Sequence, residues 1–136
     1  MTFQHVKNDL DNYLINLSMI QDLLEEIKVN TKMSQTISDM PRGKNSISDS
    51  VSSEVFRRLV LKERIKMINE RIEYIDEAIK RMDGLEKQIM EYVKNGYSIT
   101  RIAVLVNRSR PTVTNIRNKG IRKIVEYYNI HTELHN

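Results

Sequence analysis

Hydrophobic side chains recur along the first 29 residues at alternating intervals of three and four. The series consists of Phe3, Val6, Leu10, Tyr13, Leu17, Ile20, Leu24 and Ile27. This heptad spacing keeps the apolar side chains on one stripe of an α-helix and is typical of coiled coils. The pattern predicts a single amphipathic helix over residues 1–29.

A second heptad pattern follows after an interruption. Residues 30–53 are rich in serine and hold Pro41 and Gly43 but no sustained period, so a flexible linker is expected there. The second series then consists of Leu61, Ile65, Ile68, Ile72, Ile75, Ile79 and Met82. It predicts a long oligomerisation helix over residues 54–84. The pattern leaves open whether the two stripes pack within one chain or between chains.

Shorter elements are expected over residues 85–136, where breakers and caps alternate with apolar stretches. Asn95 and Gly96 end one short helix, and Ser98 is placed to cap the next. Asn107 then stands where the chain needs a residue that tolerates positive φ, and Ser109 can cap a further helix. The spacing predicts an all-α chain in which long, coiled-coil-like N-terminal helices precede a small C-terminal helix-turn-helix domain.

The last predicted helix has two contrasting sides. At 100° per residue, its inward side carries Val113, Ile116, Gly120, Ile121 and Ile124. The outward side carries Pro111, Asn115, Asn118 and Arg122, with Thr114 and Lys119 beside them. Such polar and basic side chains hydrogen-bond base edges and phosphates in a DNA major groove.

The charge distribution favours the same partner. The whole chain has 22 Lys and Arg against 18 Asp and Glu, a net charge of +4. Residues 1–50 hold 5 basic and 7 acidic side chains, whereas residues 85–136 hold 9 and 4. Between Tyr97 and Val125 there are seven basic residues and no acidic one. A basic segment of this kind indicates a polyanionic partner for the C-terminal third, with double-stranded DNA as the expected ligand.

The segment from Ser98 to Ile124 resembles region four of bacterial sigma factors. The matching features are Ile102, Ala103, Leu105, Ser109-Arg110, Thr112-Val113, Ile116 and Ile121-Arg122-Lys123-Ile124. The resemblance implies a recognition helix in the major groove. DNA contacts are then expected from Ser98, Arg101, Arg108, Ser109, Arg110, Thr112, Thr114, Asn115, Arg117, Asn118, Lys119, Arg122 and Lys123.

A wider similarity covers most of the chain. Asp39-Met40-Pro41-Arg42-Gly43, a serine-rich stretch, a charged isoleucine-rich helix and the sigma-like module follow one another as in phage transcriptional regulators of the ArpU/RinA type. This resemblance implies an activator of phage or prophage late genes in the host cytoplasm. It also implies host RNA polymerase as a second partner. A single small module contacts little DNA, so a homo-oligomer, dimer or higher, is expected.

Other classes of function find less support in the residues. The chain has no cysteine, which excludes disulfides, thiolate zinc sites and a cysteine nucleophile. His5, His131 and His135 lack further ligands at metal-binding spacing, and no catalytic arrangement is present, so neither an enzyme nor a cofactor is expected. No signal peptide or membrane helix is expected either. Two alternatives stay open: a phage small terminase subunit that binds a packaging site, and a helical anti-activator that binds a protein.

Overall fold

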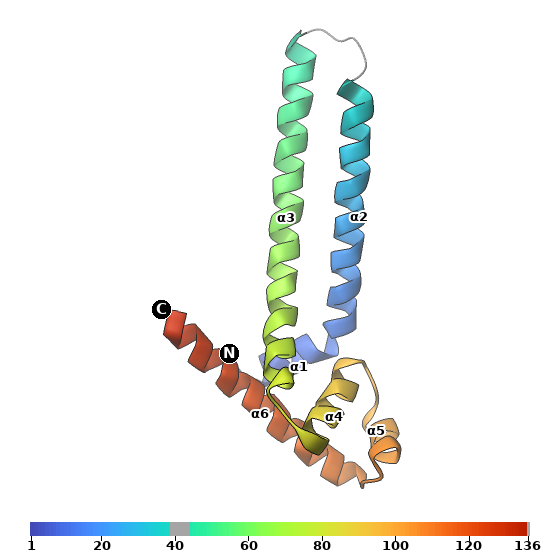
Figure 1. The fold of residues 1–136 in the computed structure, drawn as a ribbon, viewed down its shortest axis with the longest axis vertical. Coiled ribbons are helices and arrows are strands. Elements are labelled where there is room, and N and C mark those ends of the chain that lie inside the picture. Colours follow the sequence, from blue (N-terminus) through green and yellow to red (C-terminus); the bar gives the residue numbers. More distant parts are fainter. Residues whose placement is uncertain (39–43, 136) are drawn as a thin grey trace. The chain divides into compact units, whose positions relative to one another are not determined.

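The computed structural model describes residues 1–38 and 44–135, with side chains for 1–29 and 53–132. Every regular element in these ranges is an α-helix, which confirms the all-α prediction. The helices are α1 (Phe3–Asp11), α2 (Tyr13–Ser38), α3 (Lys44–Lys80), α4 (Gly84–Lys94), α5 (Ile99–Val106) and α6 (Arg110–His135) (Figure 1). None of these described helices is long and apolar enough to cross a membrane.

The chain forms two compact units that do not follow the predicted boundaries. The first unit combines residues 1–16 with residues 70–136, and the second unit comprises residues 17–69. Within the first unit, α6 contacts α1, α4 and α5, and α1 also contacts α4. The predicted C-terminal domain of residues 85–136 is therefore incomplete, because its core also includes the N-terminal helix and the end of α3.

The predicted helix over residues 1–29 is broken at Asn12, which corrects the sequence interpretation. The backbone N–H of Asn12 donates to Asn8 O at 3.0 Å, and its side-chain amide donates to the same oxygen at 2.8 Å. Such side-chain bonds to the backbone compete with helix propagation. The heptad stripe is divided accordingly: Val6, Leu10 and Tyr13 are buried, whereas Leu17 and Leu24 are exposed.

The predicted linker of residues 30–53 is also largely helical. Helix α2 continues to Ser38 and α3 begins at Lys44, while residues 39–43 lie outside the described part of the chain. Serine, threonine and asparagine lower helix stability only slightly, so a serine-rich composition does not by itself end a helix. The residues that do so strongly, Pro41 and Gly43, are both in the short segment between the two helices.

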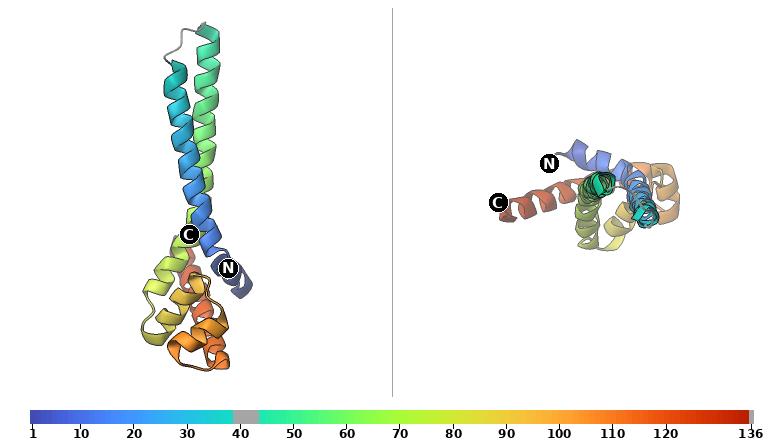
Figure 2. Two further views of the ribbon diagram at one scale, coloured as in Figure 1. Left: turned by 90° about the vertical axis from the view of Figure 1, so that its right-hand side faces the viewer. Right: turned by 90° about the horizontal axis from the view of Figure 1, so that it is seen from above.

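The second unit consists of two antiparallel helical segments, from α2 and α3 (Figures 1 and 2). Leu61 and Ile68 of α3 are buried, and Ile65 between them is half-buried, as the second heptad pattern predicts. On α2, the half-buried side chains are those of Ile20, Leu23 and Ile27. Packing within one chain therefore accounts for part of both stripes.

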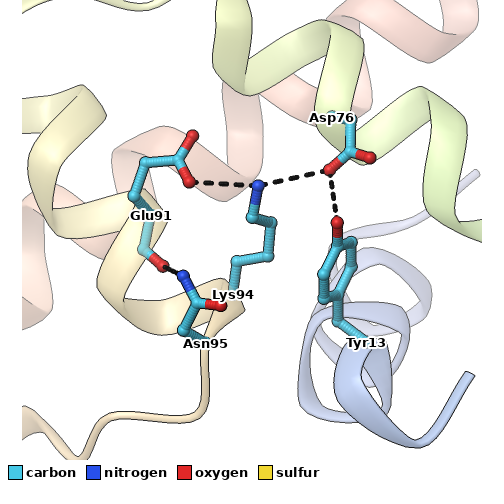
Figure 3. Close-up of polar contacts among 5 residues, drawn as sticks. All are labelled: Tyr13, Asp76, Glu91, Lys94 and Asn95. Atoms are coloured by element: carbon cyan, nitrogen blue, oxygen red, sulfur yellow. Dashed lines mark hydrogen bonds and ion pairs between the residues drawn. The ribbon is translucent and has the colours of Figure 1, made fainter. Parts of the chain in front are cut away.

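A polar network in the first unit joins α2, α3 and α4 (Figure 3). Tyr13 Oη donates to Asp76 Oδ1 at 2.8 Å, and Lys94 Nζ lies 3.3 Å from the same oxygen. Lys94 Nζ also lies 3.0 Å from Glu91 Oε2. Burial disfavours the charged form of Lys94, but the hydrogen bond to Glu91 and the surrounding negative charge outweigh it and raise the pKa of Lys94. The network fixes the C-terminal end of α4, which leads into the helix-turn-helix.

The network predicts a pH dependence of stability at high pH. Burial and the hydrogen bond to Asp76 raise the pKa of Tyr13 from 10.0 to about 12. The raised pKa means that the folded state resists deprotonation of Tyr13. Its contribution to the free energy of unfolding is therefore complete below pH 10 and is lost as the pH rises from 10 to 12. Absorbance at 295 nm measures tyrosine ionisation. Subtracting the titration of the Tyr13→Phe variant from that of the wild type should give a midpoint near 12, whereas a midpoint near 10 would contradict the network.

Candidate nucleic-acid interface

The sequence determines how α5 begins and ends. The Ser98 hydroxyl accepts a hydrogen bond from the backbone N–H of Arg101 at 3.2 Å, which confirms the predicted N-cap. At the other end, Asn107 adopts the left-handed conformation with φ 54° and ψ 50°. Asparagine tolerates this region better than most residues, and the turn redirects the chain towards α6. Both features are those expected of a helix-turn-helix.

Helix α6 begins directly after a second cap. The Ser109 hydroxyl accepts from the Thr112 backbone N–H at 3.4 Å and lies 2.8 Å from the Thr112 hydroxyl. Pro111 lies in the first turn, where a missing N–H costs no hydrogen bond. The Ser109 and Thr112 hydroxyls, both predicted as DNA ligands, therefore also stabilise the start of α6.

A small apolar core sets the angle between α5 and α6. Ile89, Ile102 and Val113 are fully buried, one from each of α4, α5 and α6, and Ala103 is only 7% exposed. The small side chain of Ala103 allows the two helices to approach closely, as the spacing predicts. Since the inward side of α6 is held by this core, its opposite side is oriented away from the rest of the module.

The outward side of α6 forms a continuous polar surface. We call it the recognition surface and define it by Arg110, Pro111, Thr114, Asn115, Asn118, Lys119 and Arg122. All of these side chains are exposed or half-exposed. An open hollow of about 620 Å³ lies at its N-terminal end, between Ile99 of α5 and the first turns of α6. The surface lacks carboxylates because residues 97–125 contain none.

Asn118 is held in one orientation by its neighbour. Arg117 donates from Nε and Nη2 to Asn118 Oδ1, at 3.4 and 3.2 Å. With its oxygen engaged, the Asn118 amide presents its Nδ2 donor. A donor at this position matches the acceptor atoms N7 and O6 of guanine, N7 of adenine or O4 of thymine in the major groove.

Three further predicted DNA ligands, all of them cations, also have partners within the protein. The Arg101 guanidinium lies over the Tyr97 ring at 4.2 Å from its centroid, and Arg108 Nη1 donates to Asn107 O at 3.3 Å. Lys123 differs most from the sequence interpretation, because its Nζ donates to Glu86 Oε1 of α4 at 2.7 Å. This hydrogen bond raises the pKa of Lys123 and ties α6 to α4. Lys123 therefore joins two helices of the first unit, a contact that the sequence pattern did not indicate.

The structure places two cations, Lys7 and the ion-paired Lys94, in a groove where the sequence patterns do not indicate them. Lys7 of α1 lines a groove of about 330 Å³ together with Ser98 and Arg117. Arg117 and Ile99 also line the hollow beside the recognition surface, so the two depressions adjoin. Lys7 lies in an acidic part of the sequence, and only the packing of α1 against α6 brings it to this region. No local sequence signal identifies it.

Comparisons with known proteins add no family assignment: no family model, curated protein or solved structure matches the chain. Among the described residues, no group of three or more His, Cys, Asp or Glu side chains could hold a metal ion. His131 instead packs against the Tyr127 ring, 4.1 Å between centroids. Among the described residues, the recognition surface is therefore the candidate functional site.

Proposed function

We propose that this protein is a sequence-specific regulator of transcription that inserts the N-terminal half of α6 into the DNA major groove. The observation that carries the proposal is the recognition surface: two asparagine amides flanked by cations, on a helix held by a capped turn and a buried core. Amides read base edges, while lysine and arginine neutralise phosphates. With the sequence resemblance, this supports an activator of phage or prophage late genes in the host cytoplasm, with host RNA polymerase as its second partner.

We further propose that the regulator acts as a homo-oligomer through the second unit. The N-terminal half of α3 leaves large apolar side chains in solvent: Phe56 is 69% exposed and Leu59 60%. Val60 and Met67 continue the stripe at helical spacing, 38% and 53% exposed. A stripe of this kind is costly in an isolated chain and is suited to pairing with another copy. Two linked modules bind two half-sites with increased affinity.

The direct test is binding to promoter-containing DNA from the protein's own genome, over a series of salt concentrations, with mass determination of the free protein. A preferred site bound by a small oligomer supports the proposal. A large ring that binds a packaging site would favour a small terminase subunit. Absence of any DNA binding at low salt would refute the proposal and favour a protein partner such as that of an anti-activator.

The salt series also distinguishes phosphate contacts from structural cations. Each phosphate contact contributes about 0.9 to the slope of log K against log salt. Replacing Lys119 and Arg122 with alanine should therefore reduce the slope by up to about 1.8 for all DNA sequences. The control Lys28→Ala/Lys62→Ala removes the same charge from exposed positions of the second unit and should leave the slope unchanged. An equal reduction in both variants would mean that overall charge, and not the recognition surface, drives binding.

A further inference from the structure

A second hollow in the first unit has a chemistry opposite to that of the recognition surface. It has a volume of about 470 Å³ and lies between the C-terminal part of α3 and the C-terminal part of α6. Its aromatic lining comes from Tyr74 of α3 and from Tyr127, Tyr128 and His131 of α6. We call it the aromatic hollow. Residues 85–125, which form the helix-turn-helix, contribute nothing to its lining.

The aromatic rings of the hollow are held in place by contacts within the protein. Tyr74 and Tyr128 pack edge to face with 5.3 Å between ring centroids. The Tyr74 hydroxyl donates a hydrogen bond to Asp9 of α1, which restricts rotation of the ring. Rings that are already ordered lose little conformational freedom when a ligand binds. The hollow is thus a preformed surface of aromatic faces and edges.

The rim of the hollow is acidic. Glu70, Glu73 and Glu77 are spaced by three and four residues, so they lie on one face of α3, and all three line the hollow. The lining residues include no lysine or arginine, although Arg81 lies against the lining Tyr127 ring at one edge. Carboxylates at this density repel phosphates, so a second stretch of DNA is a poor ligand here. Aromatic faces next to carboxylates attract cations instead.

One ring of the hollow already holds a cation from within the protein. The Arg81 guanidinium lies over the Tyr127 ring, 4.7 Å from its centroid, at the edge of the hollow. A guanidinium stacks on aromatic rings through its flat face and pairs with carboxylates through two parallel N–H donors. A lysine ammonium offers neither the flat face nor the paired donors. The lining therefore suits arginine better than lysine.

We propose that the aromatic hollow binds an arginine side chain of a basic protein segment, with the guanidinium against the rings of Tyr74 and Tyr128 and its N–H groups directed to Glu70 and Glu77 of α3. The two surfaces of the first unit then have separate partners: an acid-free surface for DNA and an acidic, aromatic one for protein. This goes beyond the proposed function, since it assigns a partner chemistry to a surface that DNA recognition does not use. Its test requires no DNA.

The test is an NMR titration of the full-length, ¹⁵N-labelled protein with a nine-residue, end-blocked Gly-Ser peptide carrying two arginines. Versions with two lysines or two glutamines in the same places, and spermidine, are the comparison ligands. With the arginine peptide, we expect saturable chemical-shift changes of the backbone amides of residues 70–77 and 127–132. The lysine peptide should bind about three-fold more weakly, because it lacks the stacking surface. The glutamine peptide should not bind.

Matched variants connect the binding to the hollow. The double variant Glu70→Gln/Glu77→Gln should lower the affinity for the arginine peptide about five-fold or more. The control variant Glu25→Gln/Glu26→Gln should change this affinity less than about two-fold. Both pairs are exposed carboxylates and remove the same charge. Three results would each overturn the proposal. They are an equal loss of peptide affinity in the two variants, an affinity for spermidine equal to that for the arginine peptide, and the absence of a saturable chemical-shift change at about 5 mM peptide. The affinity for DNA, measured without peptide, tests the recognition surface separately.

Discussion

Replacing Asn115 and Asn118 together with alanine should abolish most of the protein's preference for its own DNA site. A bidentate amide-to-base contact contributes about 1–3 kcal/mol of discrimination, and Asn118 adds a single donor contact because Arg117 engages its oxygen, so the specific affinity should fall at least about ten-fold. Binding to unrelated DNA should hardly change, because both residues are uncharged and the phosphate contacts remain. The preferred site is first selected from random duplexes with the wild-type protein. Competition titrations then compare this site with scrambled DNA.

The same helix provides a control for this experiment. Asn129 is exposed on α6, two turns beyond the recognition surface, and Asn129→Ala should leave both affinity and specificity unchanged. Arg117→Ala should have an intermediate effect, since it releases the Asn118 amide from its fixed orientation without removing it. If the double asparagine variant still selects the wild-type site, another surface reads the bases and the assignment of α6 is wrong.

Replacing Gly120 with alanine should destabilise the protein, although alanine is the better helix former. A Cβ atom at residue 120 would lie 2.5 Å from Met90 Sδ and 2.8 Å from Met90 Cγ. Met90 is fully buried, so its side chain cannot move into solvent. Helix propensity favours alanine by about 1 kcal/mol, but overpacking costs about 1–3 kcal/mol and more where two atoms collide. A net loss of up to about 2 kcal/mol in the free energy of unfolding is expected from urea denaturation.

A double-mutant cycle can attribute this loss to the contact with Met90. Met90→Ala alone should cost about 2–5 kcal/mol, because it leaves a cavity between α4 and α6. In that background Gly120→Ala should be neutral or stabilising, which gives a coupling of about 1 kcal/mol or more. A Gly120→Ala variant that is more stable than the wild type would show that α4 and α6 are not packed this closely.

The two experiments concern different properties of α6. One side of the helix carries the exposed amides that we propose to read DNA, and the other side is fixed to α4 at Gly120 and through the Lys123–Glu86 pair. A change on the inward side should lower stability and leave the specificity of the folded protein intact. A change on the outward side should lower the DNA-sequence specificity and leave the free energy of unfolding unchanged.

Local chemistry made the helix-turn-helix predictable. Ser98 and Ser109 cap helices with their own hydroxyls, and Asn107 supplies a left-handed turn, so each depends on residues within three or four positions. The apolar spacing of α5 and α6 identified Ala103 and Val113 as core residues, and both are buried. The recognition surface followed from the same helical periodicity.

The N-terminal part was predicted less well, for a physical reason. A heptad stripe shows that a helix must bury one side, but not which surface covers it. Asn12 interrupted the helix through a competing side-chain hydrogen bond, and the serine-rich segment is helical up to Ser38 and again from Lys44. Composition predicts such boundaries poorly because most residues differ by less than about 1 kcal/mol in helix propensity.

The sequence by itself determined the all-α class, the helix-turn-helix and the polar side of α6, since these depend on contacts between residues close in the chain. Only the tertiary structure revealed that α1 belongs to the C-terminal unit, that Lys123 is bound to Glu86, and that Tyr74 and Tyr128 meet in an acidic hollow. Those contacts join residues 37 to more than 50 positions apart. They depend on how whole helices pack, which periodicity along the chain does not specify.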